Sequence, residues 1–559
     1  MRILDSRRLT GASLFLDRPG AVLDIAVDED SRDLLVEAWK KNARRLFSEL
    51  EWPDEILNCR PMDDGVSLAL SGPADGLYTA TEVNEAAFEA ARDWMEGSQR
   101  HLLQRVARAL REEYRDEERP RLQRLLREAK RESVPVLLDE DEVTLGMGQH
   151  SQTWDLYEVP HPDDVQWRRL KAIPTALVTG TNGKTTTTRL LASIARAAGK
   201  VAGVSSTDWL AMGDELLDRD DYAGPGGARI VLRDKRCELA ILETARGGLL
   251  RRGLAVDHAD VALITNIAAD HLGDFGVHTM EDLADVKWSV TRALHGKATL
   301  VLNAEDPLLM SRAARWEKAL VLFSLSPRCA SYRQHIKAGG IGYTVRGGRI
   351  ERQQGDDRAT VVAVKKIPLT YDGAAKHNVA NALAAAAVAD SLGLAKSAIK
   401  KGLVALSNED NPGRANLFEV NGVSVLLDFA HNPAGFEALA PMINTLAVKR
   451  RVLITGQAGD RSDADIREFA EVSAAVKFDR VIIKRMDGHA RGRALGEVAR
   501  LMKESFEAQG FSPRQLSEKK TELDAVRAAL RWSKAGDLIV LLSHEQRDKT
   551  YEYIRQRAS

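Results

Sequence analysis

The sequence predicts an α/β protein with an α+β region at its N-terminus, a central domain on a parallel sheet and a C-terminal α/β domain. Two observations lead to this prediction. After residue 174, short continuous apolar runs alternate with helical segments, which is typical of strands buried on both faces of a parallel sheet. The same pattern begins again near Asn411, and the region before it differs. With 559 residues, the chain has room for about three or four domains, and we expect these at 1–165, 166–410 and 411–559.

Composition and charge are those of an ordinary globular protein. The chain has 80 Lys or Arg, 81 Asp or Glu, a formal charge of −1 and 44% hydrophobic residues. This balance argues against nucleic acid or a membrane surface as a partner of the whole protein. Cys59, Cys237 and Cys329 lie far apart without a CxxC pair, so we expect neither a disulfide framework nor a zinc module. Charges interrupt the N-terminus, and no run reaches the ~18 apolar residues of a membrane span. We therefore expect a cytoplasmic protein.

The N-terminal region predicts a mixture of strands and helices. Residues 1–80 indicate short strands and turns with one helix near 33–50. Residues 83–132 are rich in Arg and Glu, and their apolar side chains recur at helical spacing. The charges there indicate a solvated face of amphipathic helices. Residues 132–149 predict a strand followed by a loop.

In the central and C-terminal regions, the sequence predicts mainly strands and helices. Apolar runs predict central strands at TALVTG, VAGVSS, ELAILET, DVALITNI, ATLVLN and ALVLFS. Residues 331–370 alternate as antiparallel strands do, and the Ala-rich segment 377–393 predicts a helix with Gly393 at its C-terminal cap. C-terminal strands are expected at VSVLLDFA, RVLITG, RVIIK and DLIVLLS.

The clearest chemical signal is a glycine-containing turn between a strand and a helix. Its residues are Gly180, Thr181, Asn182, Gly183, Lys184, Thr185 and Thr186. Glycines let several backbone N–H groups face one anion, and the helix N-terminus adds partial positive charge. Lysine and threonine at these positions are the residues that contact terminal phosphates and Mg²⁺. The turn therefore predicts a P-loop-type central domain, although Val178 stands where the general pattern has its first glycine.

This turn resembles the nucleotide loop of the Mur ligase superfamily, a family of ATP-dependent amide ligases. Other motifs resemble that family in the same order: ETARGG (243–248), TNIAADHLGDFG (265–276), KHNVAN (376–381), NPGR (411–414) and LDFAHNP (427–433). From about residue 170 onward, the chain is most similar to the Mur-type part of cyanophycin synthetases, without their ATP-grasp part. The resemblance implies a Rossmann-like C-terminal domain.

The resemblance also implies roles for individual residues. ATP would be bound by the turn residues together with Asn381, Arg414 and Asp428. The implied catalytic residues are Lys184, Glu243, His271, Lys287 and Arg414. Mg²⁺ would be held by Thr185, Glu243, His271 and a carbamylated Lys287. Three alternatives stay open: His271 as a hydrogen-bonding residue, Lys287 as an unmodified surface lysine and Arg414 as a solvated loop residue.

Further polar residues are weaker candidates. Asn378 could contact the nucleotide, cap a helix or face solvent, and the loop Tyr222–Arg229 could touch the substrate amine. The remaining candidates for nucleotide or acidic-substrate contacts are His431, Asn432, Asp460, Arg461, His489, Arg491 and Arg493.

The sequence therefore favours an ATP-dependent ligase that forms an amide bond through an acyl phosphate. Its expected partners are small-molecule or peptide substrates with carboxylate and amine groups, and a homo-oligomer stays open. The resemblance favours aspartate, arginine, lysine or peptides containing them. Two alternatives are a non-catalytic ATP-binding scaffold for a peptide-polymer synthetase and a phosphotransferase, which would explain the phosphate turn but not Arg414 and Asp428.

Overall fold

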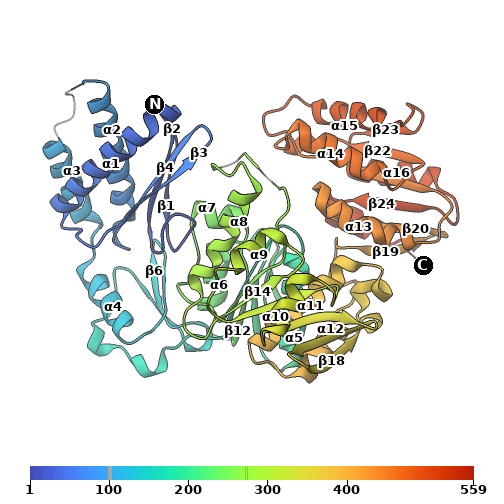
Figure 1. Cartoon of the computed structure of the whole chain (residues 1–559), viewed down its shortest axis with the longest axis horizontal. Coiled ribbons are helices and arrows are strands. Elements are labelled where there is room, and N and C mark those ends of the chain that lie inside the picture. Colours follow the sequence, from blue (N-terminus) through green and yellow to red (C-terminus); the bar gives the residue numbers. More distant parts are fainter. Residues whose placement is uncertain (99–102, 271, 274, 559) are drawn as a thin grey trace.

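The computed structural model describes residues 1–98, 103–270, 272–273 and 275–558. Their strands form four sheets of four, three, eleven and six strands. The eleven-stranded sheet belongs to the central part of the molecule, with the N-terminal sheet and the six-stranded C-terminal sheet on opposite sides (Figure 1). The predicted α/β class is thus confirmed. Within these residues, no helix has the length and apolar character needed to cross a membrane.

The N-terminal sheet is antiparallel, with the strand order β1-β2-β4-β3. Its strands are β1 (Arg2–Leu9), β2 (Gly20–Ala26), β3 (Leu57–Met62) and β4 (Gly65–Ser71). Its helices are α1 (Glu29–Leu50), α2 (Leu77–Met95), α3 (Leu103–Glu117) and α4 (Pro120–Arg131). Helices α1 and α2 pack on the sheet and bury Trp39 and Phe88. Helices α3 and α4 bury few residues, as expected for charged amphipathic helices.

A small antiparallel sheet connects this region to the central domain. It consists of β5 (Val136–Leu138), β6 (Glu142–Leu145) and β7 (Gln152–Asp155). The sequence predicted only one strand here, because a three-residue strand such as β5 is too short to show a period of two.

The central sheet has a parallel core with antiparallel strands at both edges. The order is β11-β10-β9-β12-β8-β13-β14-β15-β16-β17-β18. The parallel strands are β8 (Thr175–Thr179), β9 (Ala202–Ser205), β12 (Leu239–Glu243), β13 (Val261–Ile264), β14 (Thr299–Asn303), β15 (Leu320–Ser324) and β16 (Ile341–Arg346). The antiparallel edges are β10 (Leu210–Met212), β11 (Glu215–Asp218), β17 (Arg349–Gln354) and β18 (Asp357–Ala363).

Helices cover both faces of the parallel core, which explains its continuous apolar strands. One face carries α5 (Lys184–Ala197), α11 (Lys376–Ser391) and α12 (Lys396–Ala405). The other carries α6 (Pro225–Arg233), α7 (Arg246–Arg251), α8 (Met280–Trp288), α9 (Pro307–Ala313) and α10 (Ala330–Lys337). Leu9, Leu16 and Val22 share the core of this second face, so the N-terminal region packs directly on the central domain.

The C-terminal sheet is parallel except for its edge strand β19, in the order β19-β20-β24-β21-β22-β23. Its strands are β19 (Asn416–Val420), β20 (Val423–Asp428), β21 (Arg451–Thr455), β22 (Arg480–Lys484), β23 (Leu516–Lys519) and β24 (Leu538–Leu542). One face packs on α13 (Pro433–Thr445), α14 (Asp463–Ala474) and α15 (Glu497–Ala508), and the other on α16 (Glu522–Trp532) and α17 (Arg547–Arg555). This is the expected Rossmann-like arrangement.

Local sequence patterns predicted a helix end correctly where a capping residue marks it, and they failed for a short helix. Gly393 has a φ of 76° just after α11, as predicted. The helix α10 was wrongly predicted as strand, because Tyr332 and Ile336 are buried four residues apart, at helical rather than alternating spacing. The second half of the predicted loop 222–229 is the start of α6, where Pro225 suits the first helical position.

Close packing between α5 and α12 gives a stability prediction. A β-carbon at Gly402 would lie 2.3 Å from the Ile194 Cα. We expect Gly402→Ala to lower the free energy of unfolding by about 1–3 kcal/mol because the helices must separate, although alanine is the better helix former. As a control, Gly226→Ala in α6 meets nothing within 4 Å and should stabilise by up to about 1 kcal/mol. Urea denaturation measures both, and equal stability of the two variants would contradict the packing.

Candidate functional site

The loop between β8 and α5 has backbone contacts that only glycine permits. Gly180 has a φ of 136° and Gly183 a φ of 90°. A β-carbon at Gly180 would lie 1.9 Å from the Thr265 Oγ1, and one at Gly183 would lie 2.2 Å from the Asn381 Oδ1. Glycine is therefore required at both positions, as in loops whose backbone surrounds a phosphate.

The segment after β13 fixes this loop by hydrogen bonds. The Thr181 N–H donates to the Asn266 carbonyl at 2.9 Å, and the Asn182 N–H donates to the Asn266 Oδ1 at 3.0 Å. The Asn182 carbonyl accepts from the Thr265 Oγ1 at 2.7 Å. The first helical bond of α5 joins the Thr187 N–H to the Gly183 carbonyl. The N–H groups of residues 183–186 lie before this first bond, outside the helical ladder, where helix N-termini bind anions.

Two lysines lie beside the carbonyls of the loop. The Lys184 Nζ donates to the carbonyls of Gly180 and Thr181 at 3.1 and 2.9 Å, and the Lys287 Nζ donates to the Gly180 carbonyl at 2.9 Å. Lys287 is only 4% exposed, so the surface-lysine alternative is wrong. Burial, together with the charges of Lys184 and Arg246, lowers the pKa of Lys287 to about 7, although Asp270 raises it. Much of this amine is therefore neutral near pH 7, and only a neutral amine can form a carbamate.

Glu243, at the end of β12, is 1% exposed and lies beside the loop. Its Oε1 accepts from the Thr185 Oγ1 at 3.3 Å and from the Thr207 Oγ1 at 2.6 Å. A hydroxyl and a carboxylate oxygen this close are suitable Mg²⁺ ligands. Among the residues that the structure describes, no three His, Cys, Asp or Glu side chains form a metal cluster.

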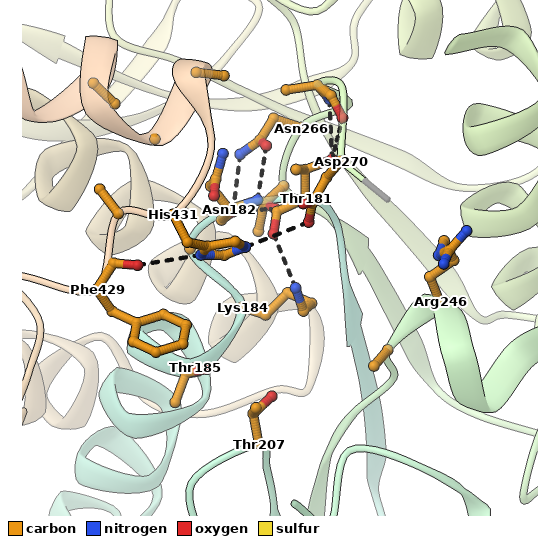
Figure 2. Close-up of a pocket in the computed structure, with 18 of the residues that line it drawn as sticks. Thr181, Asn182, Lys184, Thr185, Thr207, Arg246, Asn266, Asp270, Phe429 and His431 are labelled. Carbon is orange, nitrogen blue, oxygen red and sulfur yellow. Dashed lines mark hydrogen bonds and ion pairs between the residues drawn. The ribbon is translucent and has the colours of Figure 1, made fainter. Parts of the chain in front are cut away.

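These groups form one wall of a cleft of about 810 Å³ between the central and C-terminal domains. The opposite wall consists of segments that follow β20, β21 and β22, and Figure 2 shows Phe429 and His431 of this wall near Lys184 and Thr185. Both walls are formed by the carboxyl ends of parallel strands, where open α/β sheets bind ligands.

Asp428 and Arg414 both line the C-terminal wall. The two Asp428 oxygens accept from the N–H groups of Ala415 and Ala430, each at 2.7 Å. The Arg414 guanidinium lies 4.5 Å from the centre of the Phe429 ring, and its Nη2 is 3.5 Å from the Asp208 Oδ2. Arg414 is thus not a freely solvated loop residue.

The N-terminal part of α11 forms the wall behind the loop. Asn381 donates to the Asn378 Oδ1 at 3.2 Å, and Asn378 donates to the Leu369 carbonyl at 2.8 Å. Asn378 is 2% exposed, so the interpretation that it faces solvent is wrong. Thr186 is also buried, and all three residues line the cleft.

The two domains meet directly on the other side of the loop. The Arg461 Nη1 donates to the Asp270 Oδ1 at 2.7 Å, and the His431 Nε2 lies 3.6 Å from the Asp270 Oδ2 (Figure 2). The buried Asn432 accepts from the Asn182 Nδ2 at 3.4 Å. The contact with Asn182 attaches the C-terminal domain to the loop between β8 and α5 (residues 180–185), which is called the phosphate loop below.

The remaining candidates divide into cleft residues and supporting residues. His489 and the ion pair Asp460–Arg491 line the cleft. Arg493 instead donates to the carbonyls of Gly459 and Arg461 and supports the wall from behind.

For two further candidates, the loop 222–229 and His271, no contact with the cleft is seen among the described residues. Within the predicted loop 222–229, Arg229 points to Asp139 and Thr10 of the N-terminal region rather than into the cleft. His271 lies outside the described residues, so its predicted role stays a prediction.

Sequence reasoning missed several residues of the site. Asp208 and Asp270 follow β9 and β13, and the rule that parallel sheets bind ligands at carboxyl strand ends could have identified both. Phe429, which lines the cleft, and Arg547, which binds Asp208 at 2.5 Å, carried no such signal, because an aromatic residue after a strand and an arginine at a helix start are common.

Comparisons with known proteins agree with this arrangement. The family model described as the Mur ligase middle domain matches residues 178–389, and that of the Mur ligase glutamate ligase domain matches residues 413–544. The chain is 41% identical to cyanophycin synthetase of Synechocystis sp. over 332 residues, which are 59% of this chain and 38% of that protein. It is 36% identical to cyanophycin synthetase of Trichormus variabilis over 372 residues, 66% of this chain and 41% of that protein. The chain thus spans about two fifths of the length of these curated relatives.

Weaker similarities extend to one further ligase sequence and to one solved structure of similar fold. UDP-N-acetylmuramoyl-L-alanyl-D-glutamate–2,6-diaminopimelate ligase of Syntrophomonas wolfei is 25% identical over 67% of this chain and 73% of its own. The solved structure of E. coli FolC in complex with ADP has a TM-score of 0.52 and 20% identity, and the alignment covers 69% of this chain and 90% of that chain.

The burial of Lys287 makes stability depend on pH. The pKa of Lys287 is about 7 in the folded protein and about 10.4 in an unfolded chain, so between these values the unfolded state binds a proton that the folded state lacks. Stability therefore rises with pH in this window, by at most about 1.4 kcal/mol per pH unit from this group. We expect Lys287→Met to be more stable than the wild type below pH 7, and the difference to shrink towards pH 10.

Urea denaturation in carbon dioxide-free buffer at pH 6, 8 and 10 measures this difference. The exposed Lys401→Met in α12 is the control. A Lys287→Met effect that does not change with pH would contradict the interpretation.

Proposed function

Since the chain belongs to the Mur ligase family, we propose that it is an ATP-dependent ligase that joins a carboxylate to the amine of an amino acid or short peptide. The observation that carries this proposal is the cleft in which the phosphate loop faces Arg414 and Asp428 of a second domain. A phosphotransferase would need the loop but not this second wall. Because the curated relatives are longer than this chain, we propose one ligation reaction and not the whole activity of cyanophycin synthetase.

ATP fits the residues of the cleft. The free N–H groups at the start of α5 and the ammonium of Lys184 would bind the terminal phosphates, and Arg414 would contact them from the opposite wall. The Arg414 Nε is buried without a hydrogen-bond partner among the described residues, which favours an anion beside it. Asn381 would contact adenine, and Asp428 would accept from the ribose hydroxyls.

Mg²⁺ fits the oxygen ligands that Thr185 and Glu243 provide. We propose that these two residues bind one ion, and that His271 and a carbamylated Lys287 bind a second. Bound Mg²⁺ would neutralise the negative charge on the phosphates during transfer. Carbamylation would convert the destabilising buried cation of Lys287 into an anionic ligand.

A carboxylate must be activated before an amine can displace one of its oxygens. In the proposed reaction, a carboxylate oxygen attacks the γ-phosphorus of ATP, and the bond to the β–γ bridging oxygen breaks, which gives an acyl phosphate and ADP. The amine then attacks the acyl carbon, loses a proton and expels phosphate. The protein contributes alignment of the reacting groups, exclusion of water by the two walls, and the positive charges of Lys184 and Arg414.

Oxygen transfer tests this mechanism directly. We expect ¹⁸O from a labelled substrate carboxylate to appear in the released phosphate, because that oxygen bridges carbon and phosphorus in an acyl phosphate. Purified protein is incubated with ATP, Mg²⁺ and pairs of labelled acids and amines, beginning with aspartate, arginine, lysine and their dipeptides. Mass spectrometry then measures phosphate and amide products. A phosphorylated product without an amide would support a phosphotransferase, and ATP binding without turnover would support the scaffold.

Two substitutions test the phosphate and metal ligands. We expect Lys184→Met and Glu243→Gln each to lower kcat for ADP release by about 100- to 1,000-fold, since each removes charge from the site of phosphoryl transfer. The exposed Lys171→Met, before β8, is the matched control and should retain wild-type turnover. Unchanged kcat in either cleft variant, measured by a coupled ADP assay, is incompatible with the proposed site.

A further inference from the structure

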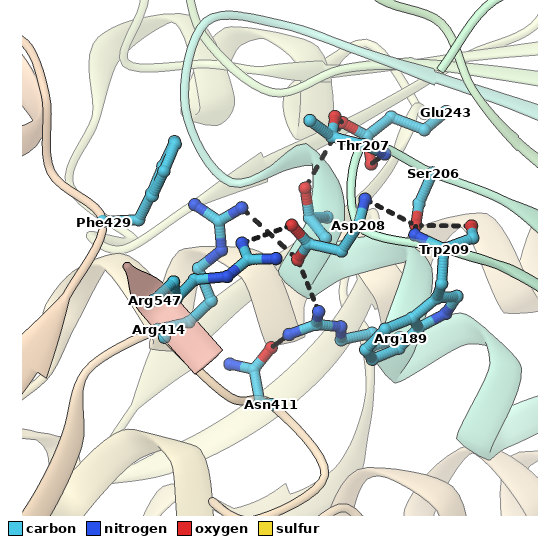
Figure 3. A network of polar contacts seen from close by, with 12 residues as sticks. Arg189, Ser206, Thr207, Asp208, Trp209, Glu243, Asn411, Arg414, Phe429 and Arg547 are labelled. Atoms are coloured by element: carbon cyan, nitrogen blue, oxygen red, sulfur yellow. Dashed lines mark hydrogen bonds and ion pairs between the residues drawn. The ribbon is translucent and has the colours of Figure 1, made fainter. Parts of the chain in front are cut away.

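One buried carboxylate is surrounded by three arginines at the edge of the cleft. Asp208, which follows β9, is 6% exposed. Its Oδ2 is 2.5 Å from the Nη2 of Arg189, and its Oδ1 is 2.5 Å from the Nη1 of Arg547. The Arg414 Nη2 is the third neighbour, at 3.5 Å. Figure 3 shows the three guanidinium groups around the Asp208 carboxylate.

The three arginines come from two domains. Arg189 belongs to α5, directly behind the phosphate loop, whereas Arg414 and Arg547 belong to the C-terminal domain. Arg414 and Arg547 also share the Phe429 ring, with distances of 4.5 and 5.9 Å to its centre. Asp208 is thus a direct ionic connection between the helix that begins at the phosphate loop and the opposite wall of the cleft.

The cluster of Asp208 and its three arginines has more positive than negative charge. Three guanidinium groups face one carboxylate in a largely buried position, and buried charge without a counter-ion is costly. Burial lowers the pKa of Arg189 to about 9. Although burial raises the pKa of Asp208, the charges of Arg414, Arg189 and Arg547 hold it well below its ordinary range. The cluster therefore keeps an excess of positive charge that suits a further anion beside Arg414.

The residue next to Asp208 contacts the proposed metal site. Thr207 donates to Glu243 through its hydroxyl at 2.6 Å and through its N–H at 3.3 Å. The turn Ser206–Trp209 is itself fixed, since the Ser206 Oγ donates to the Trp209 carbonyl at 3.1 Å. Consecutive residues of one rigid turn thus contact Glu243 on one side and the arginines of the C-terminal domain on the other.

We propose that Asp208 is a positioning residue, which holds Arg414 and Arg547 against the central domain so that Arg414 faces the nucleotide phosphates. This inference rests on the proposed function, because it assigns Arg414 to the phosphates. Asp208 itself touches no reacting atom. Without its charge, the three guanidinium groups repel one another and the C-terminal wall moves away from the phosphate loop.

The test compares Asp208→Asn with a matched pair elsewhere. Asp537 is also buried and binds Arg450 at 2.5 Å, but both residues lie within the C-terminal domain. We expect Asp208→Asn to lower kcat/KM for ATP by about 10- to 100-fold, mainly through KM, and Asp208→Glu to restore part of it. Asp537→Asn should lower stability and leave KM for ATP unchanged. An unchanged KM in Asp208→Asn, or an equal rise in both variants, would overturn the proposal.

A double-mutant cycle tests whether Asp208 acts through Arg547. If Asp208 acts through the arginines, Asp208→Asn combined with Arg547→Gln should raise KM for ATP no more than the larger single change. Fully additive effects would overturn that link.

A nucleotide-free measurement separates this inference from the proposed function. If the wild type releases no ADP with any acid and amine, the proposed function fails. Small-angle X-ray scattering without nucleotide then still tests whether Asp208 holds the two domains together. We expect a larger radius of gyration for Asp208→Asn than for the wild type and Asp537→Asn. Equal radii would overturn the role of Asp208 in holding the domains together.

Discussion

The close approach of the phosphate loop to β13 and α11 is the constraint on which the cleft depends. Gly180 and Gly183 permit contacts with Thr265 and Asn381 that no β-carbon would allow. Helix α11 can lie so close because its buried residues are mainly alanine, and small side chains let a helix approach a sheet closely. The loop is therefore held between a strand end and a helix that both belong to the core of the central domain.

Electrostatics then determine what this rigid loop can bind. Lys184 and Lys287 both bind carbonyls of the loop, and these neutral dipoles offset two ammonium charges only in part. Burial, together with the charge of Lys184, lowers the pKa of Lys287 to about 7. Arg414 adds positive charge from the opposite wall, and the Glu243 carboxylate also lines the cleft. A polyanion accompanied by a divalent cation matches this distribution better than a neutral ligand does.

The fold and the phosphate loop could be predicted from the sequence because their signals are local. Continuous apolar strands, the glycines of the loop and the cap at Gly393 each occupy a few consecutive residues. The contacts across the cleft could not be predicted in this way: Asp208 and Arg547 are 339 positions apart, and Asp270 and Arg461 are 191 apart. No periodicity in a single sequence relates the surfaces of two domains, so the pairing of these charges becomes evident only in three dimensions.

Asp428 links the two ends of the proposed nucleotide site. Its carboxylate accepts from the N–H groups of Ala415 and Ala430, and a carboxylate has about four acceptor positions, so about two remain for ribose hydroxyls. Ala415 has a φ of 56°, a conformation that costs an alanine on the order of 1 kcal/mol, and the bond to Asp428 helps to maintain it. Because Ala415 follows Arg414 directly, the carboxylate proposed to contact the ribose also holds the backbone from which Arg414, the arginine proposed to bind the phosphates, extends. In the proposed site, the sugar and phosphate ends would therefore both depend on the Asp428 side chain.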